Sequence, residues 1–85
     1  MKVQAEISLY PLRENELTKP IQQFVQVLKD NDLNVEIGPM SSLVTGEESV
    51  VFEKLRKAFG QLAEKYQIVM TAKISNTCPE VNRNK

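Results

Sequence analysis

Apolar and polar residues alternate along three stretches of the chain, the pattern of strands with one face on a core. These stretches are residues 3–9, 33–37 and 68–74, and a shorter strand is expected at 42–46 after a turn over 38–41. In the first stretch the apolar positions are Val3, Ala5, Ile7 and Leu9. Pro11 is expected to end that strand, because proline has no backbone N–H for a ladder.

Two segments between these strands have the period of amphipathic helices. Thr18 or Lys19 is expected to cap the first helix, with Pro20 in its first turn. Its apolar face is Leu17, Ile21, Phe24, Val25 and Leu28. The second helix should begin near residues 47–49, with Gly60 on its exposed side. Its apolar stripe is Val51, Leu55, Ala58, Phe59, Leu62 and Tyr66.

The element order β-α-β-β-α-β predicts an α+β fold, a ferredoxin-like sandwich. In this fold a four-stranded antiparallel sheet carries two helices on one face, and the first and third strands lie at its centre. The sequence predicts one such domain over residues 1–75 and a polar C-terminal tail over 76–85.

The sheet face without helices should carry the polar positions of the strands. They include Gln4, Glu6, Ser8, Tyr10, Asn34, Glu36, Val69, Thr71 and Lys73. The third strand offers either Ser42 with Val44 or Leu43 with Thr45. This face could be solvated, could stack on another subunit, or could hold a small ligand at that interface. Stacking on another subunit and ligand binding at that interface are favoured together, because a chain of 85 residues with a single layer of helices buries little surface by itself. A cross-strand ion pair is the favoured role for Glu6 and Lys73.

The amino-acid composition limits the classes of function that the chain is expected to have. Lys and Arg total 11, as do Asp and Glu, so the net charge of zero argues against nucleic-acid and membrane binding. The absence of histidine leaves no evident nucleophile–base pair, so no enzyme activity, cofactor or metal site is expected. The carboxylates at 30–32 and 47–48 are interpreted as turn and helix-end residues. Cys78 is expected to be an ordinary surface thiol. No secretory or membrane-spanning segment is visible, which favours the cytoplasm.

Three stretches together form a recognisable pattern: Ser8-Leu9-Tyr10-Pro11-Leu12, Gly38-Pro39-Met40-Ser41-Ser42 with Gly46-Glu47, and Ala72-Lys73-Ile74. Over about residues 3–75 the chain resembles the thiamine-binding protein family of YkoF-like domains. The resemblance implies ferredoxin-like domains that pair through their sheets into dimers or tetramers. It also implies binding of thiamine or its hydroxymethylpyrimidine moiety without catalysis.

Carried over by position, the resemblance implies a ligand site made of Glu6, Ser8, Tyr10, Met40, Ser41 and Ser42. Ser8 and Ser42 would hydrogen-bond an aminopyrimidine, Tyr10 and Met40 would form apolar walls, and Glu6 would offset the thiazolium charge. The alternative is a structural or regulatory interaction module, like an ACT domain, whose sheet face mediates assembly without this ligand.

Overall fold

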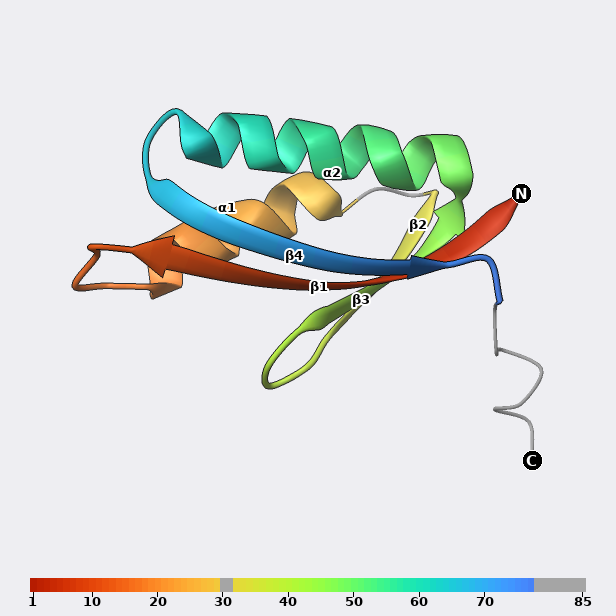
Figure 1. Ribbon diagram of the computed structural model, residues 1–85, viewed down its shortest axis with the longest axis horizontal. Helices are drawn as coiled ribbons and strands as arrows, with labels where there is room; N and C mark the ends of the chain where they lie inside the picture. Colours follow the sequence, from red (N-terminus) through yellow and green to blue (C-terminus); the bar gives the residue numbers. More distant parts are fainter. Residues whose placement is uncertain (30–31, 78–85) are drawn as a thin grey trace.

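The computed structural model describes residues 1–29 and 32–77, and its element order is the predicted one. The elements are β1 (Lys2–Leu12), α1 (Thr18–Leu28), β2 (Leu33–Ile37), β3 (Ser42–Glu47), α2 (Glu48–Ala63) and β4 (Gln67–Ser75). The strands form one sheet in the order β2-β3-β1-β4, and every neighbouring pair is antiparallel. Both helices lie on the same face of the sheet (Figure 1), which confirms the ferredoxin-like α+β fold.

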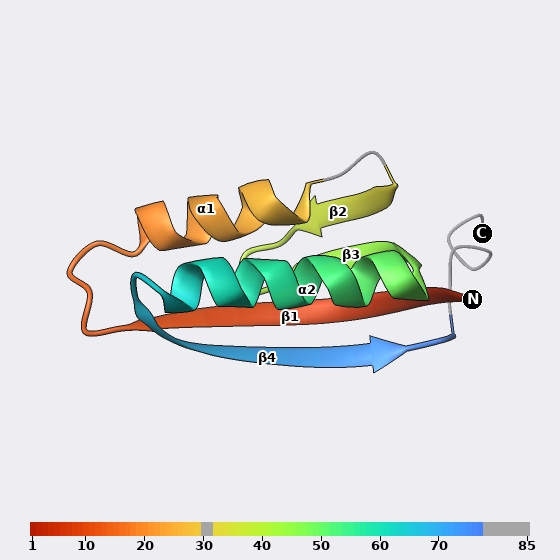
Figure 2. The ribbon, with the colours of Figure 1, turned by 90° about the horizontal axis from the view of Figure 1, so that it is seen from above.

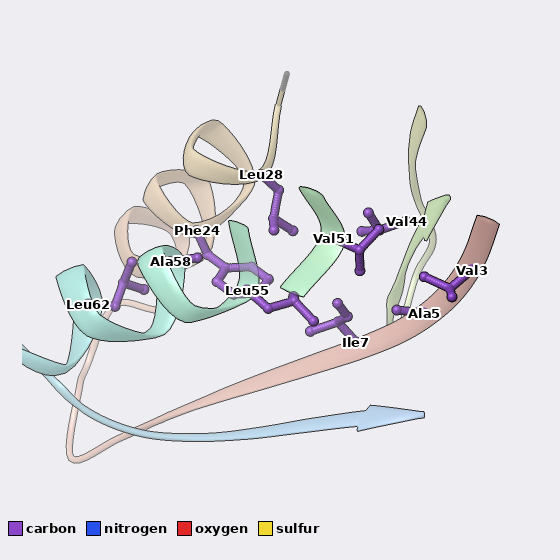
Figure 3. Close-up of a cluster of buried hydrophobic side chains, with 10 residues drawn as sticks. All are labelled: Val3, Ala5, Ile7, Phe24, Leu28, Val44, Val51, Leu55, Ala58 and Leu62. Carbon is purple, nitrogen blue, oxygen red and sulfur yellow. The ribbon is translucent and has the colours of Figure 1, made fainter. Parts of the chain in front are cut away.

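The core lies between that sheet face and the two helices (Figure 3). It consists of Val3, Ala5, Ile7, Phe24, Leu28, Val44, Val51, Leu55, Ala58 and Leu62. The strand members alternate along β1, and the helix members recur every three or four residues, so each element turns one face inward. No polar or charged side chain is buried in the described parts of the chain. The contacts between core side chains are therefore apolar.

β1 continues past Pro11, contrary to the prediction, and pairs with β4 as far as Leu12 opposite Gln67. The reason lies in the sheet register. β1 pairs with β3 only up to Ile7, so from Ser8 onward its other side has no partner strand. A proline that lacks a donor is tolerated on such an edge.

In each helix, the residues at the edge of the predicted apolar face are not buried. Leu17, and not Thr18 or Lys19, occupies the N-cap of α1, and its side chain makes no capping hydrogen bond. The buried side of α1 is centred on Pro20, Phe24 and Leu28, so Leu17 and Ile21 lie at its flank and are exposed. Phe59 of α2 is likewise exposed beside buried Ala58. Figure 2 shows α2 over β1 and β3, with β4 alongside, where its residues Ile68 and Met70 pack against the core.

Two glycines have opposite surroundings. Gly60 lies in the exposed side of α2, as predicted, and a Cβ there would have nothing within 4 Å. Gly46 is buried in β3 opposite Val3, and a Cβ there would lie 3.0 Å from the carbonyl oxygen of Asp32. Gly46 is thus required by close approach of the chain, whereas Gly60 is not.

Several predictions fall outside the described residues. Asp30, Asn31 and the tail from Cys78 onward are among them, so the domain boundary at 75 and the role of Cys78 stay predictions. β4 itself ends at Ser75. Within the described ranges, no helix is long and apolar enough to cross a bilayer.

Candidate functional site

The sheet face opposite the helices, here called the open face, carries the side chains of alternate strand residues. Their parity is opposite to that of the buried residues of β1 and β3. The open-face positions are Lys2, Gln4, Glu6, Ser8, Tyr10 and Leu12 of β1, Asn34 and Glu36 of β2, Leu43, Thr45 and Glu47 of β3, and Gln67, Val69, Thr71, Lys73 and Ser75 of β4. Figure 1 shows this face below the sheet, with both helices above it.

The parity of β3, which the sequence left open, is settled by Val44. This residue is buried and pairs with Ala5 of β1, so its side chain points toward the helices. Leu43 and Thr45 therefore lie on the open face. Ser42 has the parity of Val44 and pairs with Ile7, which places it on the helix side.

The turn between β2 and β3 brings two further predicted residues to the open face. The turn is closed by a hydrogen bond from the Gly38 amide to the Ser41 carbonyl, 2.8 Å long. In Figure 1 this hairpin end projects below the sheet, away from the helices. Ser41 Oγ donates to Glu6 Oε2 at 2.9 Å, and Ser8 Oγ donates to the Met40 carbonyl oxygen at 3.4 Å. The hairpin is thus joined to β1 through the residues of two separate sequence motifs.

We call Glu6, Ser8, Ser41 and the Met40 carbonyl the hairpin cluster. It presents carboxylate and carbonyl oxygens as acceptors and two hydroxyls, whose hydrogens are bonded within the cluster and become available to a ring nitrogen when a ligand replaces those bonds. The cluster can therefore bind a ligand with amino groups and ring nitrogens, and the Glu6 carboxylate favours a positive charge there. Among the described residues, no group of three or more His, Cys, Asp or Glu side chains could hold a metal ion.

Apolar side chains continue from the cluster along the open face. Tyr10, two residues beyond Ser8, is 51% exposed and pairs across the sheet with Val69, which is 45% exposed. The side chain of Met40, at the hairpin end, is 86% exposed. An aromatic and a β-branched residue opposite each other stabilise the strand pair. Exposed together, they also offer an apolar surface beside the polar cluster.

Two predicted arrangements are not found. Ser42 lies on the other side of the sheet from Ser8, so the two hydroxyls do not share a face. Glu6 and Lys73 are direct cross-strand partners, but the predicted ion pair does not form. The carboxylate of Glu6 bonds to Ser41, on the β3 side, while Lys73 makes no hydrogen bond or ion pair within residues 1–29 and 32–77.

Resolved pKa shifts in the described chain occur at the start of β1, away from the hairpin cluster. The Met1 amine donates to Glu47 Oε1 at 2.9 Å. This hydrogen bond and the charge of Glu47 raise the pKa of the amine above its usual 8.0. The same contact lowers the pKa of Glu47 below its usual 4.5. Both groups are exposed, so the pair is a weak tie between the residue that precedes β1 and the last residue of β3.

A broad groove of about 1110 Å³ lies in the helix layer, away from the open face. It is lined by Lys19, Ile21, Gln22, Gln23, Val25, Gln26, Val27, Lys29, Ile37, Gln61, Leu62, Glu64 and Lys65. None of the six predicted site residues lines it. Among the described residues, no side-chain hydrogen bond joins separate sequence motifs in this lining, so the open face is the better candidate site.

The register adds neighbours that the predicted site lacked. Leu43 lies directly opposite Glu6, Thr71 opposite Ser8, and Val69 opposite Tyr10. Thr71 and Val69 were expected on this face from the alternation of the last strand. Leu43 could not be assigned, because either parity of residues 42–45 gives one hydroxyl and one apolar residue.

Solved structures of several proteins have the same fold. A hypothetical protein from Methanocaldococcus jannascii superposes with a TM-score of 0.82 and 24% identity, covering 98% of this chain and 91% of the other. A "putative thiamine biosynthesis/salvage protein" from Thermotoga maritima gives 0.83 and 20%, with both chains covered completely. A Streptococcus pneumoniae protein gives 0.86 and 17%, again over the whole of both chains. At these identities the similarity establishes the fold.

No curated protein matches the chain. The YKOF-related family, in contrast, matches residues 2–81, which include all six strands and helices of the fold. The chain belongs to the YKOF-related family.

Proposed function

We propose that the chain binds thiamine or a related hydroxymethylpyrimidine compound on its open face, without catalysing a reaction on it. The observation that carries this proposal is the hairpin cluster, in which Ser41 bonds to Glu6 and the Met40 carbonyl accepts from Ser8. Membership of the YKOF-related family supports it, as does the thiamine-related name of the Thermotoga maritima structure.

The chemistry of the ligand fits the chemistry of the cluster. An aminopyrimidine carries an amino donor and ring-nitrogen acceptors, and thiamine adds a positively charged thiazolium ring. Glu6 Oε1 and the Met40 carbonyl can accept from the amino group, and the Ser8 hydroxyl can donate to a ring nitrogen once it releases its long bond to the Met40 carbonyl. Glu6 also offsets the positive charge, while the Tyr10 ring offers a flat face for stacking on a cationic or aromatic ring.

A second copy of the chain would complete this site. The open face is a sheet surface, whereas sites for small molecules usually enclose most of the ligand. Exposed Tyr10, Leu12, Met40 and Val69 give the face an apolar surface that a partner can cover. The proposed state is therefore a homo-oligomer with ligands held between open faces, consistent with a small domain that buries little surface alone.

Calorimetric titration of thiamine tests the proposal, with Glu6→Gln as the informative variant. The native protein should bind thiamine, and loss of the Glu6 charge should weaken binding about tenfold or more, since a hydrogen bond to a charged group is involved. Glu64→Gln, the same change at the exposed residue that follows α2, should leave the affinity unchanged.

Two results would contradict the proposal. One is the absence of heat with both thiamine and hydroxymethylpyrimidine. The other is equal thiamine affinity in the native protein and Glu6→Gln. If the protein remained oligomeric but bound neither compound, the exposed apolar residues of the open face would instead favour an assembly module.

A further inference from the structure

Lys73 places a positive charge beside the hairpin cluster. It lies directly opposite Glu6 on the open face and is exposed. Because Glu6 is bonded on its other side to Ser41, Lys73 has no hydrogen-bond or ion-pair partner in the described part of the chain. A lysine in this position is free to bind an anionic group brought by a ligand.

The neighbours of Lys73 on the open face are hydrogen-bonding residues. Thr71 and Ser75 flank it on β4, and their cross-strand partners are Ser8 and Gln4. Ser75 Oγ accepts from the Thr77 amide at 2.9 Å, so its hydroxyl hydrogen is available to an acceptor. The surroundings thus add neutral donors to one positive charge, the groups that bind phosphate oxygens.

The charges of this face place acid and base side by side. Glu6 lies on β1 and Lys73 on β4, with a strand spacing of about 4.8 Å. A second lysine at an open-face position is Lys2 of β1. It lies four residues before Glu6, so the two residues are about 13 Å apart along the strand. A ligand held by the hairpin cluster therefore has Lys73 as its nearest cation.

We propose that Lys73 and Thr71 form a subsite for a phosphate group, so that the preferred ligand is a phosphate ester of the compound bound by the hairpin cluster. This inference rests on the proposed function. The cationic or amino-bearing ring would lie against Glu6, and its phosphate would lie against Lys73. Because Glu6 and Lys73 form no ion pair in the free protein, the charges of the ligand need not displace one.

Calorimetric titration with thiamine and thiamine monophosphate tests this subsite. In the native protein the monophosphate should bind about three- to tenfold more tightly than thiamine, the range for one exposed charge-assisted contact. Lys73→Gln should remove that preference while leaving the affinity for thiamine within about twofold. Lys73→Arg should restore it, since a guanidinium also binds phosphate. Lys57→Gln, on the exposed side of α2, should retain the native preference.

The outcomes separate this inference from the function on which it rests. If thiamine binds but its monophosphate binds no more tightly, the subsite is wrong and the proposed function stands. If neither compound binds, the proposed function fails and the subsite fails with it. If Lys73→Gln lowers the molecular mass by light scattering and weakens thiamine and its monophosphate equally, Lys73 stabilises the assembly and the subsite is overturned.

Discussion

The two adjacent serines of the hairpin should differ in their effect on binding. Ser41 donates to Glu6 and holds one oxygen of that carboxylate, whereas Ser42 has the parity of buried Val44. Ser41→Ala should therefore lower thiamine affinity about two- to tenfold, the value of one hydrogen bond. Ser42→Ala is the matched control and should change the affinity by less than about twofold. Titration calorimetry on both variants measures the difference.

A larger loss of affinity in Ser42→Ala than in Ser41→Ala would contradict this placement, because the ligand would then reach the helix side of the sheet. Circular dichroism on both variants would show that the fold is retained. Ser41 lies in the turn and Ser42 begins β3, so neither change removes a buried apolar group.

At the scale of single residues, the sequence predicted positions on β1 better than contacts across the sheet. Strict alternation put Glu6, Ser8 and Tyr10 on one face, because buried apolar residues separate them. Ser42 was assigned to the ligand site from the family resemblance. Its face of the sheet could not be predicted, because each face of residues 42–45 carries one hydroxyl and one apolar residue. The hydrogen bond between Glu6 and Ser41 depends on how the hairpin bends, and the alternation of apolar and polar residues does not predict that bend.

At the scale of elements, α2 contains a replaceable glycine. Gly60 lies on the exposed side of the helix, and a Cβ there would meet nothing within 4 Å. Gly60→Ala should raise the free energy of unfolding by about 0.5–1 kcal/mol, because alanine loses less backbone entropy in a helix. Thermal unfolding at fixed protein concentration should show a melting temperature higher by several degrees.

Lys57→Ala, also on the exposed side of α2, is the control for Gly60→Ala. Lysine and alanine have similar helix propensities, so this variant should melt close to the native protein. A melting temperature of Gly60→Ala equal to or below that of the native protein would mean that Gly60 lies against something outside the described residues, such as another subunit.

The order, type and approximate bounds of the helices and strands were all predictable, because each has a clear period of its own. The structure differs from these predictions where the neighbours of an element, and not its own sequence, determine where a strand ends or which residues are buried. β1 passes through Pro11 since β3 has already ended beside it. Leu17, Ile21 and Phe59 are exposed because a sheet of four strands offers each helix only a narrow surface, and the residues at the margins remain outside.

For the whole molecule, we expect an oligomer that depends on the open face. Tyr10 is its large exposed aromatic residue, and such residues often contribute most to an interface. Tyr10→Ser should weaken self-association by about 2 kcal/mol, or roughly thirtyfold. Light scattering over a range of concentrations should show a lower mass than for the native protein.

Phe52→Ser is the control, because Phe52 is a similarly exposed aromatic residue on α2, at 48%. It should leave the mass unchanged. If Phe52→Ser dissociates the oligomer and Tyr10→Ser does not, the subunits pair through the helix layer and the open face stays free.

Binding on the open face is tested most directly by locating bound thiamine from amide chemical-shift changes in a ¹H–¹⁵N spectrum during titration. We expect the largest changes on the hairpin cluster and its cross-strand neighbours, at Glu6, Ser8, Ser41 and Thr71. Largest changes on the helix-layer groove, around Gln22, Gln26 and Gln61, would contradict it and would place the ligand on the opposite side of the molecule.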